Sequence, residues 1–111
     1  MYSLAFKKCM QEDIFYNKRQ QKQIIDTSLN MQGSEETTVV IMEECAELIQ
    51  AVSKCARKHD DSRINLLEEM ADVSIGMMYL KRMYDISDEE LNKAINVKLH
   101  RETIRKNMTI V

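Results

Sequence analysis

The chain contains no proline and only two glycines among its 111 residues. These two residue types most often end helices and build turns, so their scarcity favours long helices joined by short connections. Nine methionines and few β-branched runs favour the same arrangement. The sequence therefore predicts one all-α domain over residues 1–111, a bundle of four to five helices.

The clearest break in the helical pattern is the segment Asn30–Ser34, where Gly33 is expected to end one helix and Ser34 to cap the next. Further along, Ser87 and Glu90 have the spacing of a capping box. The expected helices are one or two in the N-terminal segment 1–32, then one over 35–58 and one over 88–107. Between the last two, a helix capped by Asp60, Asp61 or Ser62 is expected to run to about Tyr84.

Charge and composition exclude several classes of protein. A net charge of −2 excludes a strongly basic protein that binds nucleic-acid polymers. The N-terminus lacks the apolar run of a signal peptide, and no stretch approaches the ~20 apolar residues of a membrane span. The three cysteines show no CxxC spacing, which makes a zinc site improbable, and Cys45 and Cys55 are expected to be buried free thiols. We therefore expect a cytoplasmic protein without a membrane partner.

Two acidic clusters interrupt otherwise apolar helical segments. The first is Glu43-Glu44-Cys45-Ala46-Glu47, and the second is Glu69-Met70-Ala71-Asp72. At about 100° per residue, Glu44 and Glu47 share one helical stripe, as do Glu69 and Asp72. The neighbouring stripes are apolar and are expected to form the core. Their members are Ile41, Cys45, Leu48, Val52 and Cys55 in the first helix, and Leu66, Met70, Val73 and Met77 in the second.

An antiparallel hairpin would bring the two clusters together. If its turn is centred near His59-Asp60, Glu47 and Asp72 lie at about the same height, with Glu44 and Glu69 about a turn away on opposite helices. Four converging carboxylates repel one another strongly, and a hard divalent cation such as Mg²⁺ relieves that repulsion. The ordinary alternative is a pair of solvated acidic faces. The matched register and the absence of basic partners at i+4 favour the metal site, with Glu43 and Glu68 at its margin.

Two further features could serve a ligand. Lys98, Arg101 and Arg105 form a basic stripe that could meet phosphate oxygens, although, taken alone, a solvated cationic face near a helix C-terminus explains it better. Tyr79 follows Gly76 by one turn and could stack on a base, whereas simple packing is the commoner role of such a residue. The sequence contains no glycine-rich phosphate loop.

At these residues the chain resembles the MazG-like all-α nucleotide pyrophosphohydrolase superfamily. The family pattern is Glu-Glu-x-x-Glu followed by Glu-x-x-Asp, and here it reads EECAE and EMAD with 21 residues between Glu47 and Glu69. Downstream, NVKLHR (Asn96 to Arg101) is similar to the family's Asn-x-Lys-apolar-x-Arg segment. The resemblance covers about residues 35–107, which would be the MazG-like catalytic helices.

The resemblance implies a fold, a reaction and roles for the matching residues. The fold would be the all-α NTP pyrophosphatase type, assembled as a homodimer or homotetramer. The reaction would be (d)NTP + H₂O → (d)NMP + pyrophosphate, with Mg²⁺ as cofactor and Mn²⁺ as a substitute. A glutamate, Glu47 or Glu43, would take the proton of the attacking water. The other implied roles are metal binding by Glu44, Glu47, Glu69 and Asp72, and phosphate binding by Lys98 and Arg101, with Asn96 matching the family segment in sequence. Helical spacing, and not the resemblance, adds Arg105 to the phosphate-binding residues and Tyr79 as the residue that would bind the base.

Two other classes compete with this hypothesis. A di-iron carboxylate bundle requires Glu-x-x-His pairs, and this chain has none. A catalytically silent helical module, which retains the scaffold for interaction or regulation, stays open because an intact motif shows capacity and not activity.

Overall fold

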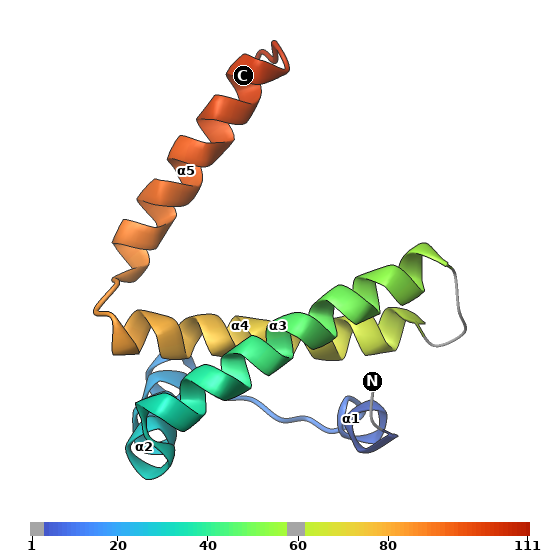
Figure 1. Cartoon of the computed structure of the whole chain (residues 1–111), viewed down its shortest axis with the longest axis vertical. Coiled ribbons are helices and arrows are strands. Elements are labelled where there is room, and N and C mark those ends of the chain that lie inside the picture. Colours follow the sequence, from blue (N-terminus) through green and yellow to red (C-terminus); the bar gives the residue numbers. More distant parts are fainter. Residues whose placement is uncertain (1–3, 58–61) are drawn as a thin grey trace. The chain divides into compact units, whose positions relative to one another are not determined.

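The structure, a computed structural model, describes residues 4–57 and 62–111 (Figure 1). These residues form five helices and no strand, which confirms the all-α prediction. The helices are α1 (Leu4–Cys9), α2 (Lys18–Gln32), α3 (Ser34–Ala56), α4 (Ser62–Met83) and α5 (Asp88–Arg105). The chain divides into two compact units, Met1–Tyr79 and Leu80–Val111, and each is described by itself. No helix in the described part is long and apolar enough to cross a lipid bilayer.

The connection between α2 and α3 is a single glycine. Gly33 has φ 88°, a value that residues other than glycine rarely adopt. Its N–H donates to the Leu29 carbonyl and ends α2. The expectation that Gly33 ends a helix is confirmed. The expectation that Ser34 caps the next helix is wrong, because Ser34 is already the first helical residue and Gly33 occupies the cap position. The Thr37 hydroxyl donates to the Gly33 carbonyl at 2.7 Å within the first turn of α3.

Helices α3 and α4 run antiparallel along each other (Figure 1). Two contacts set their register. Near one end, Gly76 lies against Ile41, and a Cβ built on Gly76 would sit 3.5 Å from the Ile41 side chain. Near the other end, the Cys55 thiol donates to the Ser62 carbonyl at 3.3 Å. Residues whose numbers sum to about 117 therefore face each other. The expected turn at His59-Asp60 lies outside the described residues.

The stripes that face each other between α3 and α4 match the expected core only in part, because Ile41 is buried as expected but several other members of its stripe are not. The buried residues are Thr37, Ile41 and Ala51 on α3 and Asn65, Glu69 and Gly76 on α4. Small side chains at Ala51 and Gly76 let the two helices approach closely, and this brings the acidic stripes inside. Part of the expected apolar stripe lies at the surface: Val52, Met70 and Met77 are exposed. Cys45 is also exposed, so the expected buried thiol is wrong there, whereas Cys55 is half-buried.

Helix α2 packs at the end of this pair where α3 begins. Ile25 of α2 is buried, and the Tyr79 hydroxyl donates to the Ser28 hydroxyl at 2.6 Å, which ties α4 to α2. The start of α2 is set by a complete capping box between Asn17 and Gln20, with N–H···O distances of 2.8 and 2.9 Å. The first unit is therefore held by α2, α3 and α4.

In the second unit, α5 begins as the sequence predicts. The Ser87 side chain accepts from the Glu90 N–H at 3.0 Å, and Lys81 forms an ion pair with Asp88 at 2.7 Å. The predicted capping box is only half formed, because within the described residues the Glu90 side chain does not return the bond to Ser87. No residue of α5 is buried.

Candidate metal centre

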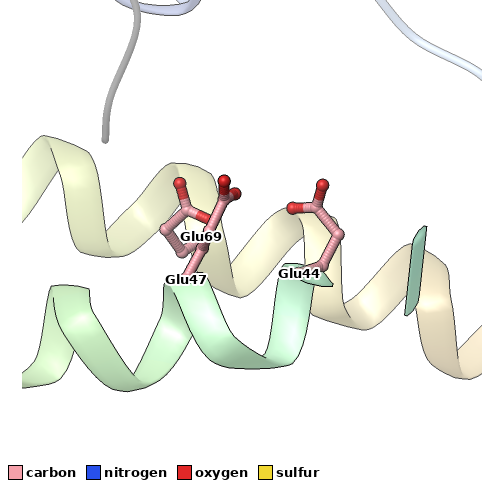
Figure 2. Close-up of side chains that lie close together, drawn as sticks. All are labelled: Glu44, Glu47 and Glu69. Carbon is pink, nitrogen blue, oxygen red and sulfur yellow. The ribbon is translucent and has the colours of Figure 1, made fainter. Parts of the chain in front are cut away.

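Three glutamates from two helices converge between α3 and α4. Figure 2 shows Glu44 and Glu47 on α3 and Glu69 on α4, with their carboxylates gathered on the same side of the helix pair. One oxygen from each lies within 4.8 Å of the other two. The register explains the convergence. The residue numbers of Glu47 and Glu69 add up to 116, so the two residues face each other at the same height along the helix pair.

Asp72 extends this group by pairing with Glu44. The two residue numbers also add up to 116, so the side chains lie opposite each other on the two helices. The pKa of Glu44 is raised to about 7, mainly by burial, and the hydrogen bond to Asp72 and the charges of Asp72, Glu47 and Glu69 contribute to the same rise. Burial also raises the pKa of Asp72, whereas its hydrogen bond with Glu44 lowers it. The hydrogen bond thus raises the pKa of Glu44 and lowers that of Asp72, so Glu44 is the donor and Asp72 the acceptor when the pair holds one proton.

Glu69 is the most deeply enclosed carboxylate of the group. Only 1% of its surface is exposed, a rare state for a glutamate unless it is paired or binds a metal. Burial raises the pKa of Glu69, and the charge of Glu47 raises it further. The pKa values of Glu44, Glu69 and Asp72 are raised because the ionised form of each carboxylate is destabilised in the folded chain. A positive charge placed between these carboxylates would stabilise the ionised forms.

The donor set fits a hard divalent cation. Mg²⁺ takes oxygen ligands at about 2.0–2.1 Å, so ligands on opposite sides of the ion lie about 4.2 Å apart. The three oxygens lie within 4.8 Å of one another, and because adjacent ligands of one ion lie closer than opposite ones, the side chains would have to draw together on binding. Glu44, Glu47 and Glu69, with Asp72 beside them, are the residues that would hold the ion.

The hairpin register predicted from equal spacing about His59-Asp60 differs from the observed one. That spacing places Glu47 level with Asp72, whereas the structure pairs Glu47 with Glu69 and Glu44 with Asp72. The two helices are displaced by about one turn from the expected alignment, and the same four carboxylates still meet. Glu43 is exposed on α3 and Glu68 is half-buried on α4, and neither is among the three converging glutamates.

Sequence reasoning missed Asn65, which precedes Glu69 by one helical turn. Asn65 is 3% exposed, and neither its Oδ1 nor its Nδ2 has a hydrogen-bond partner in the described part of the chain. One oxygen of Glu44, Oε2, is likewise buried without a partner. The signal that could have identified Asn65 is its i−4 spacing from Glu69, which puts both residues on one stripe.

A small hollow of about 130 Å³ adjoins the Glu44–Asp72 pair in the first unit. Glu44, Asp72, Gly76, Gln32 and Tyr79 are among its lining residues. The Tyr79 hydroxyl is engaged with Ser28, so the ring of Tyr79, and not its hydroxyl, is available to a ligand in this hollow.

The four residues predicted to bind phosphate all lie on α5, in the second unit. Arg105 forms an ion pair with Glu102 one turn before it, and Lys106 contacts the same carboxylate at 3.4 Å. Asn96 and Arg101 line one open hollow on α5, and Lys98 is exposed. Arg105 is thus partly neutralised, whereas Lys98 and Arg101 have no ion pair within the described residues.

Comparison of the chain with protein-family models, with curated proteins and with solved structures gives no match. The resemblance to the MazG-like pyrophosphohydrolases therefore rests on the motifs of this sequence alone.

Proposed function

We propose that the protein is a Mg²⁺-dependent nucleoside triphosphate pyrophosphohydrolase, which converts a (d)NTP and water to a (d)NMP and pyrophosphate. The observation that carries the proposal is the meeting of Glu44, Glu47 and Glu69 within 4.8 Å between two antiparallel helices, with Asp72 beside them. The burial of Glu69 supports it, because a solvated acidic face would leave that carboxylate in water.

Each carboxylate has a role in this proposal. Glu44, Glu47, Glu69 and Asp72 would hold the divalent cation, which would neutralise phosphate charge and make a water more acidic. Glu47 or Glu43 takes the proton of the attacking water. The water oxygen forms a bond to the α-phosphorus, the α–β anhydride bond breaks, and pyrophosphate leaves with the electron pair.

The rest of the substrate would be bound by groups outside the carboxylate cluster. In the proposal, Lys98 and Arg101 of α5 contact the phosphates, with Asn96 and Arg105 as further contacts. The Tyr79 ring lines the hollow next to Glu44 and Asp72 and would stack on the base.

Incubation with a panel of canonical and modified (d)NTPs and Mg²⁺ tests the proposed reaction. We expect pyrophosphate and a nucleoside monophosphate as the products for at least one nucleotide. Release of orthophosphate, or no turnover across the panel, would contradict the proposal, and the second result would favour a catalytically silent interaction module.

We also propose that the chain forms a homodimer or homotetramer through the outward faces of α3 and α4. Large apolar side chains are exposed there: Met42 at 66% and Ile49 at 71% on α3, and Met70 at 51% on α4. Large apolar side chains exposed in this number on neighbouring helices are typical of an interface. These outward faces belong to the same two helices that carry the acidic cluster. A second copy packed against them would cover the side of the helix pair away from the carboxylates and exclude water there.

The oligomer is tested by light scattering. We expect a mass at least twice the 13.0 kDa of one chain. Replacing Ile49 by Glu is expected to shift the mass toward the monomer, because it places a charge in the buried face. A 13.0 kDa species for the unmodified chain would contradict this proposal.

A further inference from the structure

The side chain of Asn65 is buried, polar and without a hydrogen-bond partner in the described part of the chain. Asn65 is 3% exposed, and both its donor, Nδ2, and its acceptor, Oδ1, lack a partner. Native proteins rarely leave both ends of an amide unsatisfied, because each costs free energy. A buried amide of this kind indicates a group that becomes satisfied when something binds.

Asn65 lies in the layer directly next to the Glu47–Glu69 pair. The register of α3 and α4 places it opposite Ala51, which is 1% exposed and has no polar side chain to offer. Side chains on a helix lean toward its N-terminus, so the Glu69 carboxylate extends over the turn that contains Asn65. The nearest groups that could form a hydrogen bond with the Asn65 amide are therefore those of the carboxylate cluster.

The two polar atoms of the Asn65 amide need different hydrogen-bond partners. Nδ2 requires an acceptor, which a carboxylate oxygen provides. Oδ1 requires a donor, and the converging groups Glu44, Glu47 and Glu69 offer none once they are ionised. Mg²⁺ retains several waters when carboxylates bind it, and those waters are donors. A hydrated cation held by the glutamates thus supplies both missing partners at once.

We propose that Asn65 is a positioning residue of the cation centre: Nδ2 donates to a carboxylate of the Glu47–Glu69 pair, and Oδ1 accepts from a water carried by the bound cation. This inference rests on the proposed function, because it requires the same glutamates to hold a divalent cation. Hydrogen-bonding partners of metal ligands commonly change metal affinity by about 10–100-fold.

The test uses Mn²⁺ as the probe, followed by electron paramagnetic resonance, and thermal melting in EDTA. Asn65→Leu keeps the approximate volume and removes both polar atoms. We expect its affinity for Mn²⁺ to fall about tenfold or more, while its melting temperature in EDTA stays equal or rises, because an unsatisfied buried amide has been removed. Asn30→Leu makes the same change at an exposed position of α2 and is expected to leave both measurements unchanged.

The outcomes separate this inference from the proposed function. If the unmodified chain binds no Mn²⁺, both fail. If it binds Mn²⁺ and Asn65→Leu binds equally well, Asn65 has no role at the centre and the proposed function stands. If Asn65→Leu and Asn65→Ala both unfold in EDTA, the amide is structural and the inference is overturned.

Discussion

Replacement of Glu47 by Gln is expected to lower the rate of pyrophosphate release by at least about 100-fold while the protein stays folded. Glu47 is the one residue assigned both to cation binding and, with Glu43 as the alternative, to accepting the water's proton. The amide keeps the shape of the side chain, but it cannot accept a proton and carries no charge for the cation. The measurement is the rate of pyrophosphate release from the best substrate of the nucleotide panel, with folding checked by circular dichroism.

The matched control for this prediction is Glu35→Gln. Glu35 is exposed in the first turn of the same helix, away from the converging carboxylates. We expect the control to retain the activity of the unmodified enzyme. Equal losses in Glu35→Gln and Glu47→Gln, or full activity in Glu47→Gln, would show that Glu47 does not take part in the reaction.

Without divalent cations, the protein is expected to become less stable as the pH rises from about 5 to about 7.5. The pKa of Glu44 is about 7 in the folded chain, against an ordinary value of 4.5. Between these values the folded state binds more protons than the unfolded state, so the free energy of unfolding decreases with rising pH. Protonation of Glu44 contributes stability that is fully present below about pH 4.5 and is lost as the pH rises through about 7. The raised pKa values of Glu69 and Asp72 act in the same direction.

Melting temperatures in EDTA and in Mg²⁺ measure this effect. In EDTA we expect a decrease of about 5–10 °C between about pH 5 and pH 7.5. Mg²⁺ is expected to restore the melting temperature at the higher pH and to have little effect at the lower one, because protonated carboxylates bind cations poorly. Glu44→Gln is the matched variant: its amide can donate to Asp72 at every pH, so the decrease in EDTA should be smaller. A rise in melting temperature with pH in EDTA, or an equal effect of Mg²⁺ at both pH values, would contradict the account.

Much of the fold follows from local signals in the sequence. Without proline, the helices continue until a specific residue ends them, as Gly33 does between α2 and α3. Ser34 looked like the cap only because its hydroxyl suits that role. The conformation of Gly33, with φ 88°, moves the boundary one residue earlier. The exact start of α3 therefore depends on the φ angle of Gly33, which the residue types alone do not specify.

The carboxylates of the site were predictable, but the way the helices pair was not. Helical spacing shows that Glu44 and Glu47 share a stripe, and it does not show which stripe faces the neighbouring helix. Hydrophobicity favoured the stripe with Ile41 and Val52. The structure buries Ile41 from that stripe and Ala51 from the acidic one, whereas Val52 is exposed. The exposed apolar stripe is then available for the proposed second copy. Asn65 was missed because one asparagine in a helix usually lies on the surface.

The central claim is that the glutamates between α3 and α4 bind a divalent cation, and Mn²⁺ titration tests it most directly. Free Mn²⁺ is followed by electron paramagnetic resonance as it is added to the unmodified chain and to Glu69→Gln, which neutralises the most buried carboxylate. The variant is expected to be at least as stable in EDTA, since a buried amide costs less than a buried charge. We expect saturable binding by the unmodified chain and at least tenfold weaker binding by Glu69→Gln. Equal binding by the two proteins, or none by either, would contradict the assignment of a metal centre.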